Sequence, residues 1–126
     1  MSGINKLTFP LGLFLPGSVV KIRFPFQDDP SKYKERPAVV IQVSPDKIEV
    51  IMLKITSHAA RGKYDYTLRD AAMANLKNGS VVRCNHMLTL TGQYKCESVG
   101  SVSTYDFINI TTSFNVALSH NDTVSY

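Results

Sequence analysis

The fold expected for this chain follows from the stretch RPAVVIQVSPDKIEVIMLKIT, residues 36–56. Two runs rich in valine and isoleucine, residues 36–43 and 48–55, flank Ser44-Pro45-Asp46-Lys47, which suits a type I turn with proline at its second position. Because β-branched residues favour strands, the two runs predict a β-hairpin. Their centres are almost continuously apolar, which places both strands deep in a sheet. Pro37 has no N–H to donate and should lie at the strand start or at an edge.

The segments on either side of this hairpin predict a mainly β protein. Strands are expected over residues 18–24, 64–68, 80–90 (bent in its middle) and 96–102, with one or two helical turns over residues 69–76. A C-terminal helix should begin at Ser103, a typical N-cap, because Asp106 favours the positive helix start and apolar residues follow at helical spacing. Short turns between consecutive strands favour an antiparallel sheet, curled into an SH3-like barrel and capped by this helix. Residues 120–126 are expected to form a frayed tail.

Length and composition predict one domain over residues 1–126, with its core at about residues 16–118 and a flexible arm or tail at each end. Lys and Arg number 14 against 10 Asp and Glu, and the formal charge of +4 suits an anionic partner as well as an ordinary cytosolic domain. Cys84 and Cys96 are too few for a disulfide scaffold and lack the spacing of a zinc site, so neither metal nor cofactor is expected. Without a signal peptide or a run of about 20 apolar residues, the chain is predicted to be cytoplasmic and to cross no membrane.

Three segments, in this order and spacing, resemble the MazF/PemK toxins of bacterial type II toxin–antitoxin systems. They are PGSVV with FPF (residues 16–26), RPAVV with ITS (residues 36–57) and SVVRCNH with LTL (residues 80–90). The resemblance covers roughly residues 16–118. It implies a plasmid-maintenance-toxin barrel, a homodimer, and sequence-dependent cleavage of single-stranded RNA. It also implies a cognate antitoxin protein that blocks the active site, with DNA bound only through the toxin–antitoxin complex.

The same resemblance assigns catalytic roles to three residues. Arg36 matches the arginine ahead of the PAVV strand, Thr56 the threonine that ends the next strand, and Arg83 the arginine of the PemK-type RCDQ motif. The loop over residues 25–35 matches a flexible loop beside the RNA groove. This chain departs from the motif, because Asn85 and His86 replace the Asp-Gln pair, and Asn85 cannot ionise to serve as a general base.

Metal-free RNA cleavage requires chemistry that these residue types can supply. A base removes the proton of the ribose 2′-OH, cations stabilise the phosphorane, and an acid protonates the leaving 5′-oxygen, which yields a 2′,3′-cyclic phosphate and a 5′-OH. The planar guanidinium of Arg36 suits phosphate oxygens, and the hydroxyl of Thr56 can donate to one of them. This hypothesis requires the two groups to meet across neighbouring strands, within reach of solvent.

Further polar residues near these positions are expected to contact RNA. They are Ser57, His58, Lys34, Asn85 and His86. Ser57 could take the part of Thr56, and either histidine could act as acid or base because imidazole titrates near neutrality. Aromatic side chains that could stack on bases are Tyr33, Tyr64 and Tyr66.

Two other classes of function fit the same fold. The first is a non-catalytic binder, either a CcdB-like gyrase poison, which would act through an aromatic C-terminal tail such as Tyr126, or a degenerate module that binds RNA or antitoxin. The second is a small SH3-like adaptor without catalysis. The Asn85 substitution motivates the binder, whereas Arg36, Thr56 and Arg83 favour the endoribonuclease.

Overall fold

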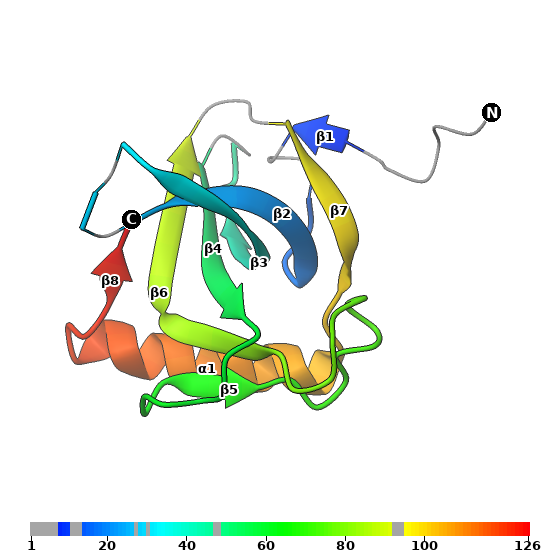
Figure 1. The fold of residues 1–126 in the computed structure, drawn as a ribbon, viewed down its shortest axis with the longest axis vertical. Coiled ribbons are helices and arrows are strands. Elements are labelled where there is room, and N and C mark those ends of the chain that lie inside the picture. Colours follow the sequence, from blue (N-terminus) through cyan, green and yellow to red (C-terminus); the bar gives the residue numbers. More distant parts are fainter. Residues whose placement is uncertain (1–7, 11–13, 27, 30, 47–48, 92–94) are drawn as a thin grey trace.

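The computed structural model describes residues 8–10, 14–26, 28–29, 31–46, 49–91 and 95–126 (Figure 1). The described chain forms β1 (Thr8–Pro10), β2 (Ser18–Pro25), β3 (Tyr33–Val43), β4 (Glu49–Thr56), β5 (Asp65–Thr67), β6 (Val81–Thr91), β7 (Lys95–Ser101), α1 (Thr104–Ser119) and β8 (Val124–Ser125). The strands join in one sheet in the order β1-β7-β2-β3-β4-β6-β5, and β8 pairs with β6. The prediction of a mainly β fold with a C-terminal helix is confirmed.

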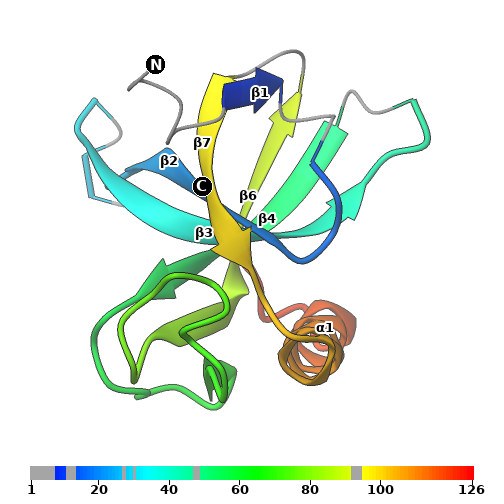
Figure 2. The same cartoon turned by 90° about the vertical axis from the view of Figure 1, so that its right-hand side faces the viewer.

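The sheet is strongly curled but open (Figure 2). Neighbours along it are antiparallel, and β8 alone among the described strands runs parallel to its partner. Its outermost strands, β1 and β5, do not pair with each other within the described residues. The predicted SH3-like barrel is therefore present as a curled sheet that does not close.

The hairpin predicted from residues 36–56 is β3 and β4, with Val39 opposite Leu53 and Val40 opposite Met52. Val39 and Leu53 belong to the cluster that packs against α1, whereas Val40 and Met52 belong to a second cluster on the other face. This explains the continuous apolar run, because both faces of the hairpin are buried. Pro37 pairs with β2 inside β3, and the β4 ladder begins one residue later, so the strand is an edge on that side.

Helix α1 begins as predicted from its cap. The Ser103 side chain accepts a hydrogen bond of 3.1 Å from the Asp106 N–H. Ile110, Phe114 and Ala117 are buried against the sheet, on whose lower side the helix lies in Figure 2. In the described part of the chain, no helix has the length and apolar character needed to cross a bilayer.

The prediction of one or two helical turns over residues 69–76 is wrong. The chain instead makes tight turns over residues 71–75, with Asn75 at a φ of 57°, a left-handed conformation that asparagine tolerates. The N–H groups of Arg69 and Asp70, which a helix start would leave free, donate to the carboxylate of Asp106. Asp106 on the distant helix thus anchors the start of this turn segment.

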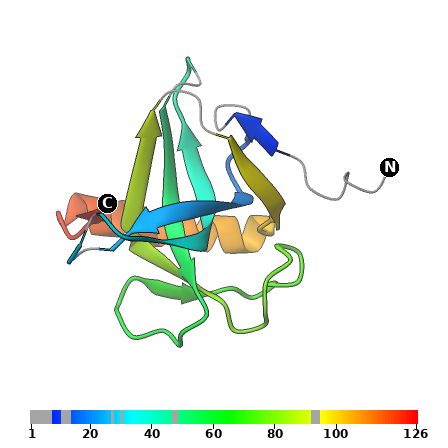
Figure 3. The same ribbon diagram turned by 45° about the horizontal axis from the view of Figure 1, so that its top comes forward.

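The prediction of a frayed C-terminal tail is also wrong. Asn121, at a φ of 58°, ends the helix, and β8 then runs beside β6 with Val124 opposite His86 (Figures 1 and 3). The Asp122 carboxylate accepts a hydrogen bond of 2.6 Å from the Tyr64 hydroxyl, and the Tyr126 N–H donates to the Met87 carbonyl. These tertiary contacts order the segment.

At the other end, the expected flexible arm is in part a strand. Residues 8–10 form β1 on the edge of β7. The remainder of the predicted arm, residues 1–7 and 11–13, lies outside the described residues.

Candidate functional site

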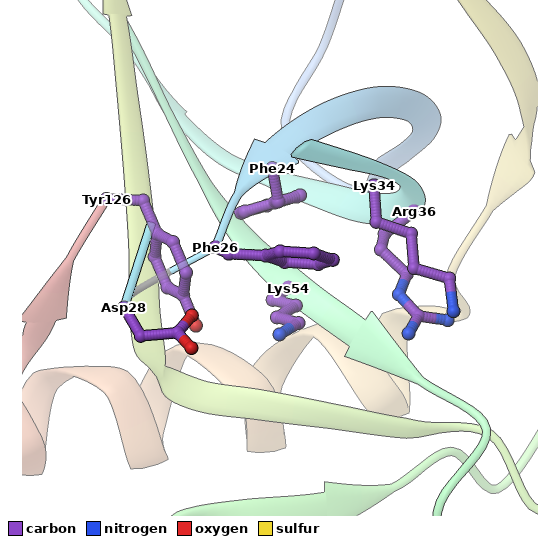
Figure 4. A pocket seen from close by; sticks show the side chains of 7 residues that line it. All are labelled: Phe24, Phe26, Asp28, Lys34, Arg36, Lys54 and Tyr126. Atoms are coloured by element: carbon purple, nitrogen blue, oxygen red, sulfur yellow. The ribbon is translucent and has the colours of Figure 1, made fainter. Parts of the chain in front are cut away.

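A small pocket opens where the β2–β3 hairpin end, β4 and the C-terminal strand meet (Figure 4). Its volume is about 110 Å³, and its lining consists of three cations, one carboxylate and three aromatic rings, namely Lys34, Arg36, Lys54, Asp28, Phe24, Phe26 and Tyr126. Lys34 and Arg36 lie on one side of it, Asp28 and Tyr126 on the other, and Phe26 between them. This lining suits an anionic ligand that also carries a flat ring.

The sheet register brings the cations to one face from three adjacent strands. Arg36 on β3 lies beside Ile22 of β2, Lys54 on β4 lies opposite Ala38 of β3, and Arg83 on β6 lies opposite Lys54. The β4–β6 register shifts next to this point, where Leu53 pairs with Met87 and Lys54 with Arg83. The bend predicted for the strand at residues 80–90 is therefore confirmed, and it is what sets Arg83 against Lys54.

The positive charge of Lys54 is disfavoured by its surroundings. Burial lowers its pKa, and the neighbouring charges of Arg36 and Arg83 lower it further. Among the described residues, no carboxylate lies within 4 Å of the Lys54 ammonium or the Arg36 guanidinium. A bound anion would relieve this repulsion, so the pocket is prepared for a negative charge.

Arg83 has a partner of its own. Its Nε lies 3.4 Å from Asp65 Oδ1, with 22% of the arginine side chain and 3% of the aspartate side chain exposed. Burial alone would raise the pKa of Asp65, but hydrogen bonds from the Arg61 and Gly62 N–H groups and the nearby charge of Arg83 together lower it. Arg83 is thus paired with Asp65, lies opposite Lys54 on the neighbouring strand and does not line the pocket, and its catalytic role stays a prediction.

Thr56 is less accessible than the sequence hypothesis requires. The residue is only 7% exposed, and its hydroxyl oxygen accepts a hydrogen bond of 3.2 Å from the His58 N–H. The ladder ends at Ala38 and Lys54, and continuing its register by two residues sets Arg36 level with Thr56 on the same face. The expected proximity across the strands agrees with this register, whereas the burial of Thr56 counts against direct contact with a phosphate, and its role stays a prediction.

The remaining predicted RNA-binding residues fall into three groups. Lys34 lines the pocket beside Arg36. Ser57 and His58 are exposed in the turn after β4 and do not line it. Asn85 and His86 hold the C-terminal segment instead: Asn85 Nδ2 donates to the Asp122 carbonyl, and His86 Nδ1 lies 2.8 Å from the Tyr126 hydroxyl.

His86 is neutral at neutral pH. Burial is the main cause that lowers its pKa to about 4, and Arg83 and Lys54 lower it further. A ring so hard to protonate is a poor general acid near pH 7. Its evident task is to position Tyr126.

Of the tyrosines expected to stack on bases, two are structural. The buried Tyr64 donates to Asp122, and the Tyr66 hydroxyl donates to Asp106. Tyr33 is exposed but lies against the guanidinium of Arg23, 4.6 Å from ring centroid to Cζ.

Five residues of the pocket were not among the site residues predicted for the endoribonuclease: Phe24, Phe26, Asp28, Lys54 and Tyr126. A signal did exist for Lys54, which is the one charged residue in the apolar run VIMLKI. Lysine is seldom buried without a task, so a charge in a central strand indicates function. For Tyr126 no local pattern pointed to the pocket, because its position depends on the path of β8.

A curled antiparallel sheet on one helix defines a small β protein equipped to hold an anion, because the three cations in the pocket between its strands have no carboxylate within 4 Å among the described residues. A family model described as PemK-like, MazF-like toxin of type II toxin–antitoxin system matches residues 15–118, and the chain belongs to this family.

Solved structures resemble the fold at low sequence identity. One, titled an endoribonuclease from Mycobacterial species, has a TM-score of 0.60 at 14% identity, over 84% of this chain and 91% of that chain. Two crystal structures of MazE-MazF from Deinococcus radiodurans, Form-III and Form-II, both have a TM-score of 0.58, at 16% and 17% identity, over 82% of this chain and 94% of theirs. A comparison with curated protein sequences gave no significant match.

Proposed function

We propose that this protein is the endoribonuclease toxin of a type II toxin–antitoxin system, which cleaves single-stranded RNA in a sequence-dependent way without a metal ion. The proposal rests on one observation. Arg36 and Lys54 line the same open pocket, and among the described residues no carboxylate lies within 4 Å of either cation. Family membership supports it, as does the likeness of the fold to a structure titled an endoribonuclease.

The proposed reaction uses the 2′-OH of the substrate as nucleophile. A bond forms between O2′ and phosphorus while the bond to O5′ breaks. The 2′-OH proton passes to a base and solvent water protonates O5′, which gives a 2′,3′-cyclic phosphate and a 5′-OH. Arg36, with Lys54 beside it, stabilises the charge that develops on the phosphorane. Asp28 is the carboxylate that lines the pocket and is suited to take the 2′-OH proton, a task that Asn85 cannot perform.

The same proposal covers the partners. We expect a homodimer, because α1 exposes apolar side chains away from the sheet, including Tyr105, Ile108 and Leu118. We expect a cognate antitoxin with an acidic segment that competes with RNA for the cationic pocket, in keeping with the MazE-MazF titles of two similar structures. The working compartment would be the cytoplasm, where mRNA is available.

The test is to map RNA ends after incubating purified protein with single-stranded RNA in EDTA. Wild type should cut, Arg36→Ala should cut slowly or not at all, and Lys77→Ala, which removes an exposed lysine that does not line the pocket, should cut normally. A substrate with 2′-deoxyribose at the scissile nucleotide should survive. Its cleavage would exclude 2′-OH attack, and binding without any cleavage would identify a non-catalytic binder.

A further inference from the structure

The C-terminal segment lies outside the part of the chain that the family model matches, residues 15–118, and yet it is built into the pocket. Asp122 is held by Tyr64 and Asn85, and Tyr126 is held by the Met87 carbonyl. These anchors come from the loop before β5 and from β6. The segment is therefore a fixed element of the tertiary structure, with Tyr126 at its inner end.

The ring of Tyr126 has a defined place in this pocket. It makes an edge contact with Phe24, with ring centroids 5.4 Å apart and an interplanar angle of 86°, and the Lys54 ammonium lies 5.4 Å from its centroid. The His86 ring fixes its hydroxyl at 2.8 Å. Contacts at both the hydroxyl and the ring thus fix the orientation of Tyr126, which forms one wall of the pocket.

The pocket combines what an unpaired nucleotide needs. Phe26, 42% exposed, and Tyr126 offer aromatic surface, whereas Arg36 and Lys54 offer positive charge a few ångströms away. A cavity of about 110 Å³ is somewhat smaller than the ~150 Å³ that encloses a benzene ring, but this one is open to solvent. It can receive one flat ring, with the attached phosphate on the cations outside.

We propose that Tyr126 is the base-stacking residue of the RNA site, so that the C-terminal strand supplies the platform on which a base next to the bound phosphate rests. The proposal rests on the function proposed above and adds a positioning residue to it. His86 and Asn85 then act through the C-terminal segment, by holding the ring in place.

The opposite role for the same contact is an autoinhibitory strap that fills the site. The observed geometry favours the platform, because the ring lies along the wall and leaves the cavity beside Arg36 open. The segment is also tied down by hydrogen bonds at Asp122, at the backbone and at the Tyr126 hydroxyl. A platform should lose activity when its ring is removed, whereas a strap should gain it.

The experiment measures binding of a single-stranded oligonucleotide that carries the mapped cleavage sequence with 2′-deoxyribose at the scissile nucleotide. Tyr126→Leu should weaken binding by roughly 5- to 160-fold, the range for losing one base–aromatic stack. Tyr126→Phe, which keeps the ring, should bind nearly as wild type. Met73→Ala, which removes an exposed apolar side chain from the turn over residues 71–75, should bind as wild type and is the control.

An abasic substitution, moved along the flanking nucleotides, then locates the stacked base. At one position it should weaken binding to wild type but have little effect on Tyr126→Leu, because a double-mutant cycle isolates the contact between ring and base. Thermal unfolding of each variant separates lost stacking from lost folding.

The outcomes distinguish this inference from the function on which it rests. If wild type cuts RNA and Arg36→Ala does not, but Tyr126→Leu binds and cuts as wild type, the platform is wrong and the endoribonuclease stands. If Tyr126→Leu cuts faster, the segment is a strap and the platform is wrong. If wild type neither binds nor cuts RNA, both proposals fall.

Discussion

Lys54 and Arg83 face each other across β4 and β6, a pair of like charges in the middle of the sheet. Arg36 adds a third charge, and burial together with these two neighbours lowers the pKa of Lys54. Asp65 offsets only the charge of Arg83. Cations held this close repel one another in the free protein. A bound anion offsets that repulsion, so the arrangement favours binding of an anionic ligand.

Replacing Lys54 by methionine should weaken RNA binding and reduce the dependence of log K on log salt concentration by about 1, because one phosphate contact is lost. Stability should not fall, since the change removes a half-buried charge that faces Arg83. Salt titrations of binding, with thermal unfolding alongside, measure both effects. Lys77→Met, which removes an exposed lysine from a turn, is the control and should leave the salt dependence unchanged. An unaltered slope in Lys54→Met would show that Lys54 meets no phosphate.

His86 should make the folded state sensitive to mild acid. Its pKa is lowered to about 4, first by burial and then by Arg83 and Lys54, whereas an unfolded histidine titrates near 6.5. Between these values the unfolded state binds more protons than the folded state. The contribution of His86 to the free energy of unfolding is therefore fully present above about pH 6.5 and is lost as the pH drops toward 4. The loss should be on the order of 2 kcal/mol once partial exposure is allowed for.

Denaturant unfolding between pH 4 and 7.5 measures this loss. His86→Gln should flatten the profile in that window, while His58→Gln, which removes an exposed histidine, should keep the wild-type slope. A His86→Gln profile as steep as wild type would assign the loss to other groups.

Asp106 should be essential for stability. It is fully buried, accepts hydrogen bonds from the Tyr66 hydroxyl and from the Arg69 and Asp70 N–H groups, and follows the helix cap. Burial alone would raise its pKa, but these bonds outweigh it and the pKa is lowered. Its contribution is therefore present above the ordinary carboxyl range and is lost as the pH falls through the folded pKa.

Asp106→Ala leaves these donors without an acceptor and should cost roughly 3 kcal/mol or more of unfolding free energy. Asp70→Ala removes an exposed carboxylate that accepts from the Met73 N–H, and should cost under about 1 kcal/mol. Urea denaturation at pH 7 compares the two. Equal losses would mean that the buried network is not what joins α1 to the turn before residue 71.

The two thiols should be inert in the folded protein. Burial raises the pKa of Cys84 to about 12 and that of Cys96 to about 11, so the thiolate of Cys84 at pH 8 is roughly a thousandfold rarer than for a free cysteine. Iodoacetamide should label neither residue in buffer and both in denaturant, as counted by mass spectrometry. Rapid labelling of folded protein would show that one of the two sites opens.

Gly100 should resist substitution, because a Cβ there would lie 2.8 Å from the carbonyl carbon of Ala74 and 2.9 Å from its oxygen. The turn over residues 71–75 packs too closely on β7 for a methyl group, and Gly100→Ala should cost about 1–3 kcal/mol. At Gly62 a methyl would approach Asp65 no closer than 3.9 Å, so Gly62→Ala should change the unfolding free energy far less. Chemical denaturation measures the free energy of unfolding of both variants. An unchanged value for Gly100→Ala would mean that the turn over residues 71–75 can move away from β7.

Local patterns in the sequence were enough for the β3–β4 hairpin, the bend in β6 and the Ser103 cap, because each depends on neighbours along the chain. Period-two and continuous apolar runs, a proline turn and a capping serine are short-range physical signals. Arg36, assigned through the resemblance of the RPAVV segment to a known family, and Lys34, named as a cation near it, both line one pocket, and their roles stay predictions.

Only the tertiary structure decided how distant segments meet. The shift in register that opposes Lys54 to Arg83, the acceptor that Asp106 offers to residues 69 and 70, and the docking of β8 beside β6 all join parts of the chain far apart in sequence. The residues after α1 have the composition of a frayed end, and they are ordered because Tyr64, Asn85 and His86 supply hydrogen-bond partners that no local pattern encodes.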